Sequence, residues 1–167
     1  MFSSSQDFFT ASSLFVQIFN VWVARMTPNA TADHICYKCA SSDEFESMRQ
    51  LFESSSTFIY QSIISHRRIA IVKFLEPIKT SLGPIWFLEL SDQKPDGSQK
   101  SEFDHIEIYP NVGTMDDLAA ALESKGEKLE KIIRPHHTTF DAFLEGTFKV
   151  RLEPDALIGK IKREEMV

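Results

Sequence analysis

Hydrophobic and polar positions alternate in two stretches of this chain that begin with the same three residues. Asp33-His34-Ile35 opens the first stretch, and Asp104-His105-Ile106 lies near the start of the second. Successive side chains of a strand point to opposite faces. The second stretch is therefore predicted to be a strand with one apolar and one polar face. One face should carry Phe103, His105, Glu107 and Tyr109, and the other Asp104, Ile106 and Ile108.

The remaining pattern predicts the same series of elements in both halves of the chain. Strands are expected over residues 31–39, 57–64, 68–74 and 85–91, and again over 103–110, 128–134, 138–144 and 147–152. A helix follows the first strand of each half, with capping boxes at Ser41/Glu44 and Thr114/Asp117 and a C-terminal Gly126. Residues 77–84 and 92–102 are expected to be loops.

This order predicts an internal duplication. We expect an α+β fold in which two βαβββ modules, residues 31–91 and 103–153, form one curved mixed sheet around a cavity, with helices on the convex side. The whole chain, residues 1–167, is interpreted as one domain.

The N-terminal segment, residues 1–30, is predicted to be an amphipathic helix that docks on this domain. Its apolar residues keep helical spacing from Phe8 to Met26, and Ser4 with Asp7 fits a helix cap. The first residues lack the positive region of a signal peptide. The apolar run is also interrupted, so a membrane span is not expected.

Composition and charge exclude some classes of binding partner for this protein. The chain has 167 residues, 43% of them hydrophobic, and a net charge of −6. An acidic chain is a poor partner for nucleic acid or for an anionic membrane surface. Cys36 and Cys39 have CxxC spacing, but on a strand their sulfurs point to opposite faces, which argues against a zinc knuckle or a disulfide. Two reduced cysteines fit a cytoplasmic protein.

Polar residues at matching places in the two halves suggest a metal site. His34 and His105 begin equivalent strands, while Glu89 and Glu153 lie near the end of the last strand of each half. Two imidazoles and two carboxylates can hold Zn, Fe(II), Mn, Co or Ni, and suit Ca or Mg less well. The alternative is two strand histidines satisfied by backbone or solvent.

Other polar residues are candidates for proton transfer or for ligand binding. Glu153 or Glu107 could move a proton, although Glu107 could also be a solvated residue or support the ligands. An anionic group could be bound by Lys38, Tyr109, Arg151 and Arg68, which could equally be exposed strand residues. The pair His136-His137 could supply a ligand or a base, but a surface position is the simpler interpretation.

These residues resemble a known family. Residues 32–35, the stretch ending at Glu89, residues 104–108 and residues 147–154 are similar to the vicinal oxygen chelate superfamily, which includes glyoxalase I, bleomycin-resistance proteins and extradiol dioxygenases. Within it, the chain and its leading helix look most like the YecM family of metal-binding proteins. The resemblance implies metal ligands at His34, Glu89, His105 and Glu153.

Three functions remain open from the sequence. The first is a metalloenzyme of isomerase, lyase or dioxygenase type that acts on a small oxygen-rich molecule. The second is a module that binds or sequesters a small ligand without turnover. The third is an interaction protein that has kept the fold alone, which four candidate ligands argue against. The sequence leaves the oligomeric state undetermined.

Overall fold

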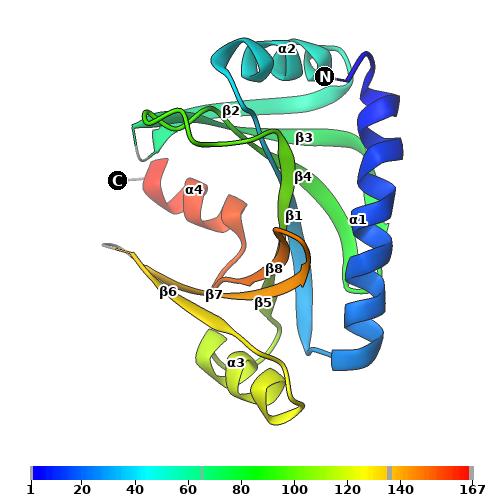
Figure 1. Ribbon diagram of the computed structural model, residues 1–167, viewed down its shortest axis with the longest axis vertical. Coiled ribbons are helices and arrows are strands. Elements are labelled where there is room, and N and C mark those ends of the chain that lie inside the picture. Colours follow the sequence, from blue (N-terminus) through cyan, green and yellow to red (C-terminus); the bar gives the residue numbers. More distant parts are fainter. Residues whose placement is uncertain (1, 65, 135–136, 166–167) are drawn as a thin grey trace.

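The computed structural model describes residues 2–64, 66–134 and 137–165, and it contains an eight-stranded mixed sheet with four helices in this part of the chain (Figure 1). The elements are α1 (Ser5–Met26), β1 (Ala30–Lys38), α2 (Ser42–Glu53), β2 (Ser56–Ile64), β3 (Arg67–Thr80), β4 (Gly83–Ser91), β5 (Glu102–Pro110), α3 (Met115–Ser124), β6 (Glu130–Ile133), β7 (Thr138–Glu145), β8 (Phe148–Leu152) and α4 (Leu157–Glu165).

Strand pairing confirms the predicted duplication. The sheet order is β2-β3-β4-β1-β5-β8-β7-β6. β1 runs parallel to β4, and β5 runs parallel to β8 in the same way. The two modules meet where β1 and β5 pair antiparallel. The predicted α+β class, with a curved mixed sheet and an N-terminal helix, is therefore correct.

Local sequence explains where the helices begin and end. The Ser4, Ser41 and Thr114 hydroxyls each accept a hydrogen bond from the backbone N–H three residues on. Only Thr114 forms the complete capping box, because Asp117 also accepts from its backbone. After α3, Gly126 has φ of 88°, a left-handed conformation that glycine adopts without a Cβ clash.

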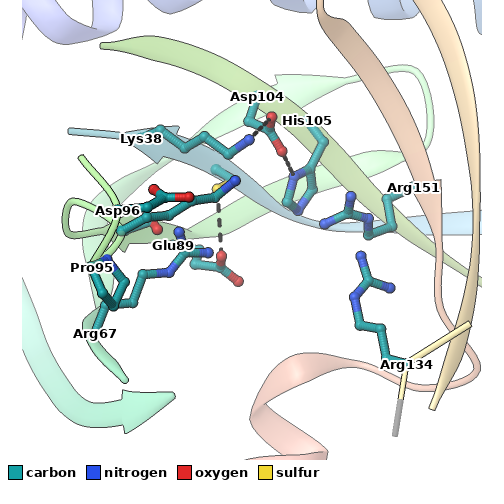
Figure 2. A pocket seen from close by; sticks show the side chains of 12 residues that line it. Lys38, Arg67, Glu89, Pro95, Asp96, Asp104, His105, Arg134 and Arg151 are labelled. Carbon is teal, nitrogen blue, oxygen red and sulfur yellow. Dashed lines mark hydrogen bonds and ion pairs between the residues drawn. The ribbon is translucent and has the colours of Figure 1, made fainter. Parts of the chain in front are cut away.

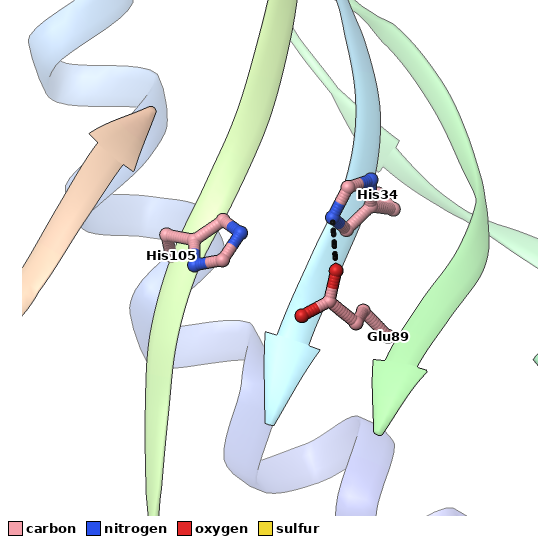
Figure 3. A group of neighbouring side chains, drawn as sticks. All are labelled: His34, Glu89 and His105. Atoms are coloured by element: carbon pink, nitrogen blue, oxygen red, sulfur yellow. Dashed lines mark ion pairs between the residues drawn. The ribbon is translucent and has the colours of Figure 1, made fainter. Parts of the chain in front are cut away.

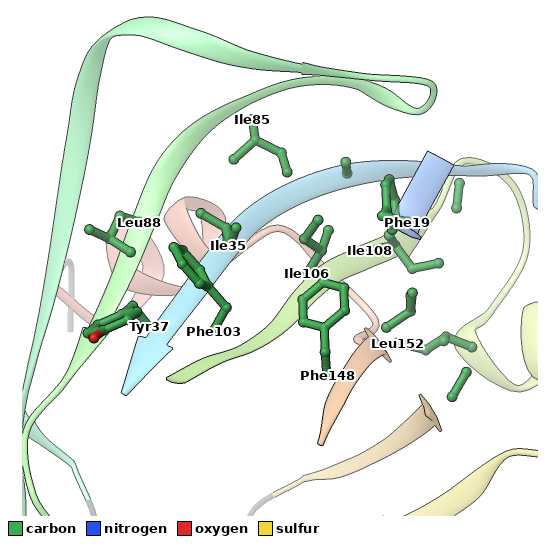
Figure 4. Close-up of a cluster of buried hydrophobic side chains, with 14 of the residues drawn as sticks. Phe19, Ile35, Tyr37, Ile85, Leu88, Phe103, Ile106, Ile108, Phe148 and Leu152 are labelled. Carbon is green, nitrogen blue, oxygen red and sulfur yellow. The ribbon is translucent and has the colours of Figure 1, made fainter. Parts of the chain in front are cut away.

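The hydrophobic core lies between the convex face of the sheet and α1, α2 and α3 (Figures 1 and 4). Side chains from the middle strands of both modules meet there, as the apolar strand faces predict; they include Ile35, Leu88, Ile106, Ile108 and Val150. α1 contributes Phe8, whose ring contacts those of Tyr37, Phe52 and Phe103. The opposite, concave face is left for polar side chains.

α4 departs from the expectation that the helices lie on the convex side. Its first backbone N–H, at Leu157, donates to Asp33, and Lys160 donates to Glu153. In Figure 1 this helix lies in the opening of the curved sheet. This helix was not predicted from the sequence, although Leu157, Ile158 and Ile161, just after Pro154, were a signal for it.

Two β-bulges change the predicted face of the strand residues. The pairing of β1 with β5 slips at Asp33 and again at Asp104. As a result Phe103 packs in the core with Ile106, three residues on, whereas Asp104 and His105 contact each other on the other side. Strict alternation, which placed Phe103 with His105, is therefore wrong at this position.

Residues 77–84, expected to be a loop, are instead mostly part of a long hairpin. Ile78 pairs with Ile85, and Thr80 pairs with Gly83. The irregular pairing between Lys73 and Ile78 accommodates Pro77, which cannot donate a ladder hydrogen bond.

α1 has the length and the composition of a helix that could cross a membrane, a property that core helices and signal sequences share. In this structure one face of it is buried, including Phe8, Val16, Phe19 and Trp22.

Candidate metal centre

Each module supplies one Asp–His pair to the concave face. Asp33 Oδ2 lies 2.8 Å from Nδ1 of His34, and Asp104 Oδ2 lies 2.7 Å from Nδ1 of His105. The bulges at both aspartates put neighbouring residues within reach of one another, which regular alternation would prevent. A carboxylate on Nδ1 favours the tautomer that keeps a lone pair on Nε2.

The two Nε2 atoms face a common space (Figure 3). The rings of His34 and His105 are 5.6 Å apart, and both are buried. Neither Nε2 atom has a hydrogen-bond partner among the described residues. The nearest carboxylate oxygen to Nε2 of His34 is that of Glu89, at 3.5 Å. One ligand atom from each of these three residues lies within 4.8 Å of the others.

Glu107 approaches the same space from β5. Its Oε2 is 3.7 Å from Nε2 of His34 and 4.0 Å from Nε2 of His105. Burial raises its pKa to about 8, and the negative charges of Glu153 and Glu89 add to this against the opposing charge of His34. The carboxyl group therefore holds a proton at neutral pH when no cation is bound.

The pKa values of Glu89, His105 and His34 are also shifted by burial and by neighbouring charges. Burial tends to raise the pKa of Glu89, but His34 lowers it to about 2. Burial lowers the pKa of His105 to about 4, helped by the charge of Arg151. For His34, burial favours a lower pKa, but the charge of Glu107, once that carboxyl ionises, and the carboxylate of Asp33 outweigh it and raise the pKa.

Glu153, expected among the ligands, is not in the group of His34, Glu89 and His105 whose ligand atoms lie within 4.8 Å of one another. It follows β8, and its Oε2 accepts a 2.6 Å hydrogen bond from Lys160 of α4. Its Oε1 is 3.5 Å from Nε2 of His137, which is otherwise largely exposed. The ammonium group of Lys160 is thus paired with the carboxylate that the sequence assigned to the metal ion. His136 lies outside the described residues.

The expected anion-binding residues divide between the two faces. Lys38 and Arg151 line a cavity of about 500 Å³ beside Glu89 and His105 (Figure 2). Arg68 instead pairs with Asp92 and Glu46 and stacks on Phe45, on the α2 side. The cause is register: Ile69 pairs with Ser91, which lines the cavity, so Arg68 points the other way. Tyr109 is half-buried near the end of β5 and does not line this cavity.

Two arginines of this site were not singled out by the sequence. Arg67 and Arg134 line the cavity. Cys36 also faces it, and its thiol lies 3.4 Å from Oε1 of Glu89. Burial and the charge of Glu89 raise the pKa of this thiol, so it is protonated. Cys39 is in the core on the other face, and both cysteines are free. The signal for Cys36 was its place two residues after His34, on the same face of β1. The sequence carried no corresponding signal for the two arginines.

The donor set fits a divalent transition metal. Two buried imidazole nitrogens without hydrogen-bond partners would be costly unless they met a cation or water. Their Nδ1 partners orient them in the manner of metal-bound histidines. Glu89, whose side chain is 22% exposed, completes three donors and faces the cavity.

The metal-free protein is expected to lose stability as pH rises from about 6.5 to about 8. In this range folded Glu107 keeps a proton that the unfolded carboxyl has lost, so the free energy of unfolding falls with pH. The lowered pKa of His105 matters only below this range. One such group contributes at most about 1.4 kcal/mol per pH unit.

Urea unfolding in EDTA at several pH values measures this dependence. Glu107→Gln removes the ionisable group and should flatten the profile. A wild-type stability that rises over this range would contradict the assignment.

One family model and several solved structures are similar to this chain. The model of the family described as YecM protein matches residues 5–153. A solved structure described as Structural Genomics, Protein EC4020 has a TM-score of 0.76 at 20% identity, covering 95% of this chain and 92% of that one.

A variant of Streptomyces coelicolor methylmalonyl-CoA epimerase in complex with 2-nitronate-propionyl-CoA has a TM-score of 0.47 at 14% identity, covering 73% of this chain and 94% of its own. A search of curated proteins finds no match.

Proposed function

Because this chain belongs to the YecM protein family, we propose that it binds one divalent transition metal ion through His34, Glu89 and His105. We further propose that it is a metal-dependent enzyme that moves a proton on a small oxygen-rich molecule. One observation carries the proposal: two buried imidazoles, each fixed by an aspartate, direct unpartnered Nε2 atoms to one space beside a carboxylate.

The donor types favour Zn, Co, Ni, Mn or Fe(II). Imidazole nitrogen is a preferred ligand of these ions, whereas Ca and Mg prefer oxygen ligands. Cys36 is not counted as a ligand, because its protonated thiol donates a hydrogen bond to Glu89. Its CxxC partner Cys39 takes no part, since it lies in the core.

The residues of the chain have separate roles in this proposal. When the imidazoles are neutral, Asp33 and Asp104 accept from Nδ1–H and so leave the lone pair of Nε2 free for the ion. When bound, the metal ion supplies Lewis-acid chemistry by polarising an oxygen of the ligand. Glu107, whose Oε2 lies 3.7 Å and 4.0 Å from the Nε2 atoms of His34 and His105, is placed to take up a proton and return it. Glu153 stays paired with Lys160 and so joins the end of β8 to α4.

A second candidate function follows from the number of ligands. With Glu153 held by Lys160, the group near the imidazoles contains two histidines and one carboxylate, Glu89. Two histidines and one carboxylate with open positions are typical of non-haem Fe(II) oxygenases. Oxygen consumption by Fe(II)-loaded protein with a set of catechols separates this candidate from proton transfer.

The metal content of the protein tests the proposal directly. Protein purified without chelator is expected to contain close to one transition-metal ion per chain by mass spectrometry. After EDTA treatment, Zn, Mn, Co or Ni at 100 times its dissociation constant should stabilise the fold by about 2.7 kcal/mol. Metal-free protein with no thermal shift for any of these ions would refute the metal site and favour a module that binds its ligand without metal.

A further inference from the structure

The cavity beside the metal group is rich in positive charge, although the chain as a whole is acidic. Five cationic side chains line it against three carboxylates: Lys38, Arg67, Lys94, Arg134 and Arg151 face Glu89, Asp96 and Asp104. The net charge of the whole chain is −6. A cavity of opposite sign concentrates anions and disfavours cationic or neutral ligands.

Two of these cations are already neutralised. Arg151 makes two 2.8 Å hydrogen bonds to the carboxylate of Asp141, and Lys38 is paired with Asp104. These pairs are partly or fully buried. Both side chains therefore have a carboxylate partner without any ligand.

Arg134 has no such partner among the described residues. Its Nη1 donates one hydrogen bond, 2.6 Å long, to the hydroxyl of Thr139. Burial and the nearby charge of Arg151 lower its pKa, which reflects an unfavourable position for a second guanidinium. An anion between or beside the guanidinium groups of Arg134 and Arg151 would relieve this repulsion. A single guanidinium can donate two parallel hydrogen bonds to two oxygens of one carboxylate or phosphate.

Arg67 provides a second unpaired guanidinium at the other side of the cavity. In Figure 2 it lies across Glu89 from Arg134 and Arg151. Its Nη1 donates to Oε1 of Gln99 at 2.7 Å, and its buried Nε has no hydrogen-bond partner among the described residues. Gln99 is in turn fixed by three backbone carbonyls, those of Cys39, Ser91 and Asp92. The linker between the modules thus positions Arg67 at the cavity.

We propose that this cavity binds a small organic anion with two acidic groups, one held by Arg134 and the other by Arg67, with Glu89 and His105 between them. The inference rests on the proposed function, since it names the substrate class of the same site. The two arginines act as binding residues, and Gln99 positions one of them.

Calorimetric titration with succinate and glutarate tests the inference, with the neutral diamide succinamide as the control ligand. The titrations use both zinc-loaded and EDTA-treated full-length protein. Arg134→Gln and Arg67→Gln are each expected to weaken dicarboxylate binding at least tenfold, because each removes charge-assisted hydrogen bonds. Arg25→Gln, an exposed arginine on α1 that pairs with Glu127, is the matched control and should bind like the wild type.

The metal-induced thermal shift shows that each variant is folded and has an intact metal group. Arginine-dependent binding to EDTA-treated protein would support the anion site even if the metal titration failed. A normal metal shift without dicarboxylate binding would overturn this inference alone. Equal binding of succinate and succinamide, or loss that depends on one arginine only, would also overturn it.

Discussion

Replacing His34 and His105 together by alanine is expected to abolish the stabilisation of this protein by divalent metal ions. At a free metal concentration 100 times the dissociation constant, the wild type should gain about 2.7 kcal/mol, and the double variant none. For a chain of this size that gain is roughly 5–11 °C in melting temperature. The reason is that the double variant lacks both imidazole nitrogens that are proposed to bind the metal ion, and only carboxylate ligands remain.

Metal-induced differences, rather than absolute melting temperatures, are the measurement. Removing the imidazoles takes one hydrogen bond from each of the buried carboxylates of Asp33 and Asp104, which costs about 1–3 kcal/mol for each group. The single variants retain more of the fold if the double variant is too unstable. His66→Asn is the control, because residue 66 lies in a turn at φ 63° and asparagine tolerates this conformation. Equal shifts in wild type and double variant would place the metal elsewhere.

Asp104→Ala is expected to cause the largest loss of stability among the polar positions of the site, about 3–5 kcal/mol. The carboxylate of Asp104 is buried and accepts from Lys38, from Lys149 at 2.8 Å and from His105. Its removal leaves cationic groups in a mostly buried place without their counter-charge. Metal affinity should also fall 10–100-fold, because His105 loses the group that orients it.

The equivalent residue of the first module is the matched comparison. Asp33 accepts from His34 and from the backbone N–H of Leu157, and no lysine pairs with it among the described residues. Asp33→Ala should therefore cost less, about 1–3 kcal/mol. Urea unfolding of both variants in EDTA measures the difference, and calorimetry measures the metal affinity. Equal losses would mean that the two lysines contribute nothing to the role of Asp104.

The sequence by itself determined the two-module sheet of this protein and the helices on its convex side. Capped helices and alternating segments in equivalent order were sufficient to predict two βαβββ modules, because helix caps and strand periodicity are local properties. The apolar faces with Ile35 and Ile106 determine which side of the sheet meets the helices. The repeated Asp-His pair also marked the polar face of both central strands.

The tertiary structure decided which polar residues meet. The bulges at Asp33 and Asp104 depend on the register between β1 and β5, which a single strand does not specify. Register between β3 and β4 likewise assigned the cavity to Arg67 and the outer face to Arg68.

Contacts between residues far apart in the chain decided the rest. The position of α4 joined Lys160 to Glu153, and the linker joined Gln99 to Arg67. The periodicity of the sequence does not predict these pairs, because each depends on where a segment outside the sheet packs against it. The sequence therefore determined the scaffold and the residue types of the site, and only the packed chain decided which of them share one space.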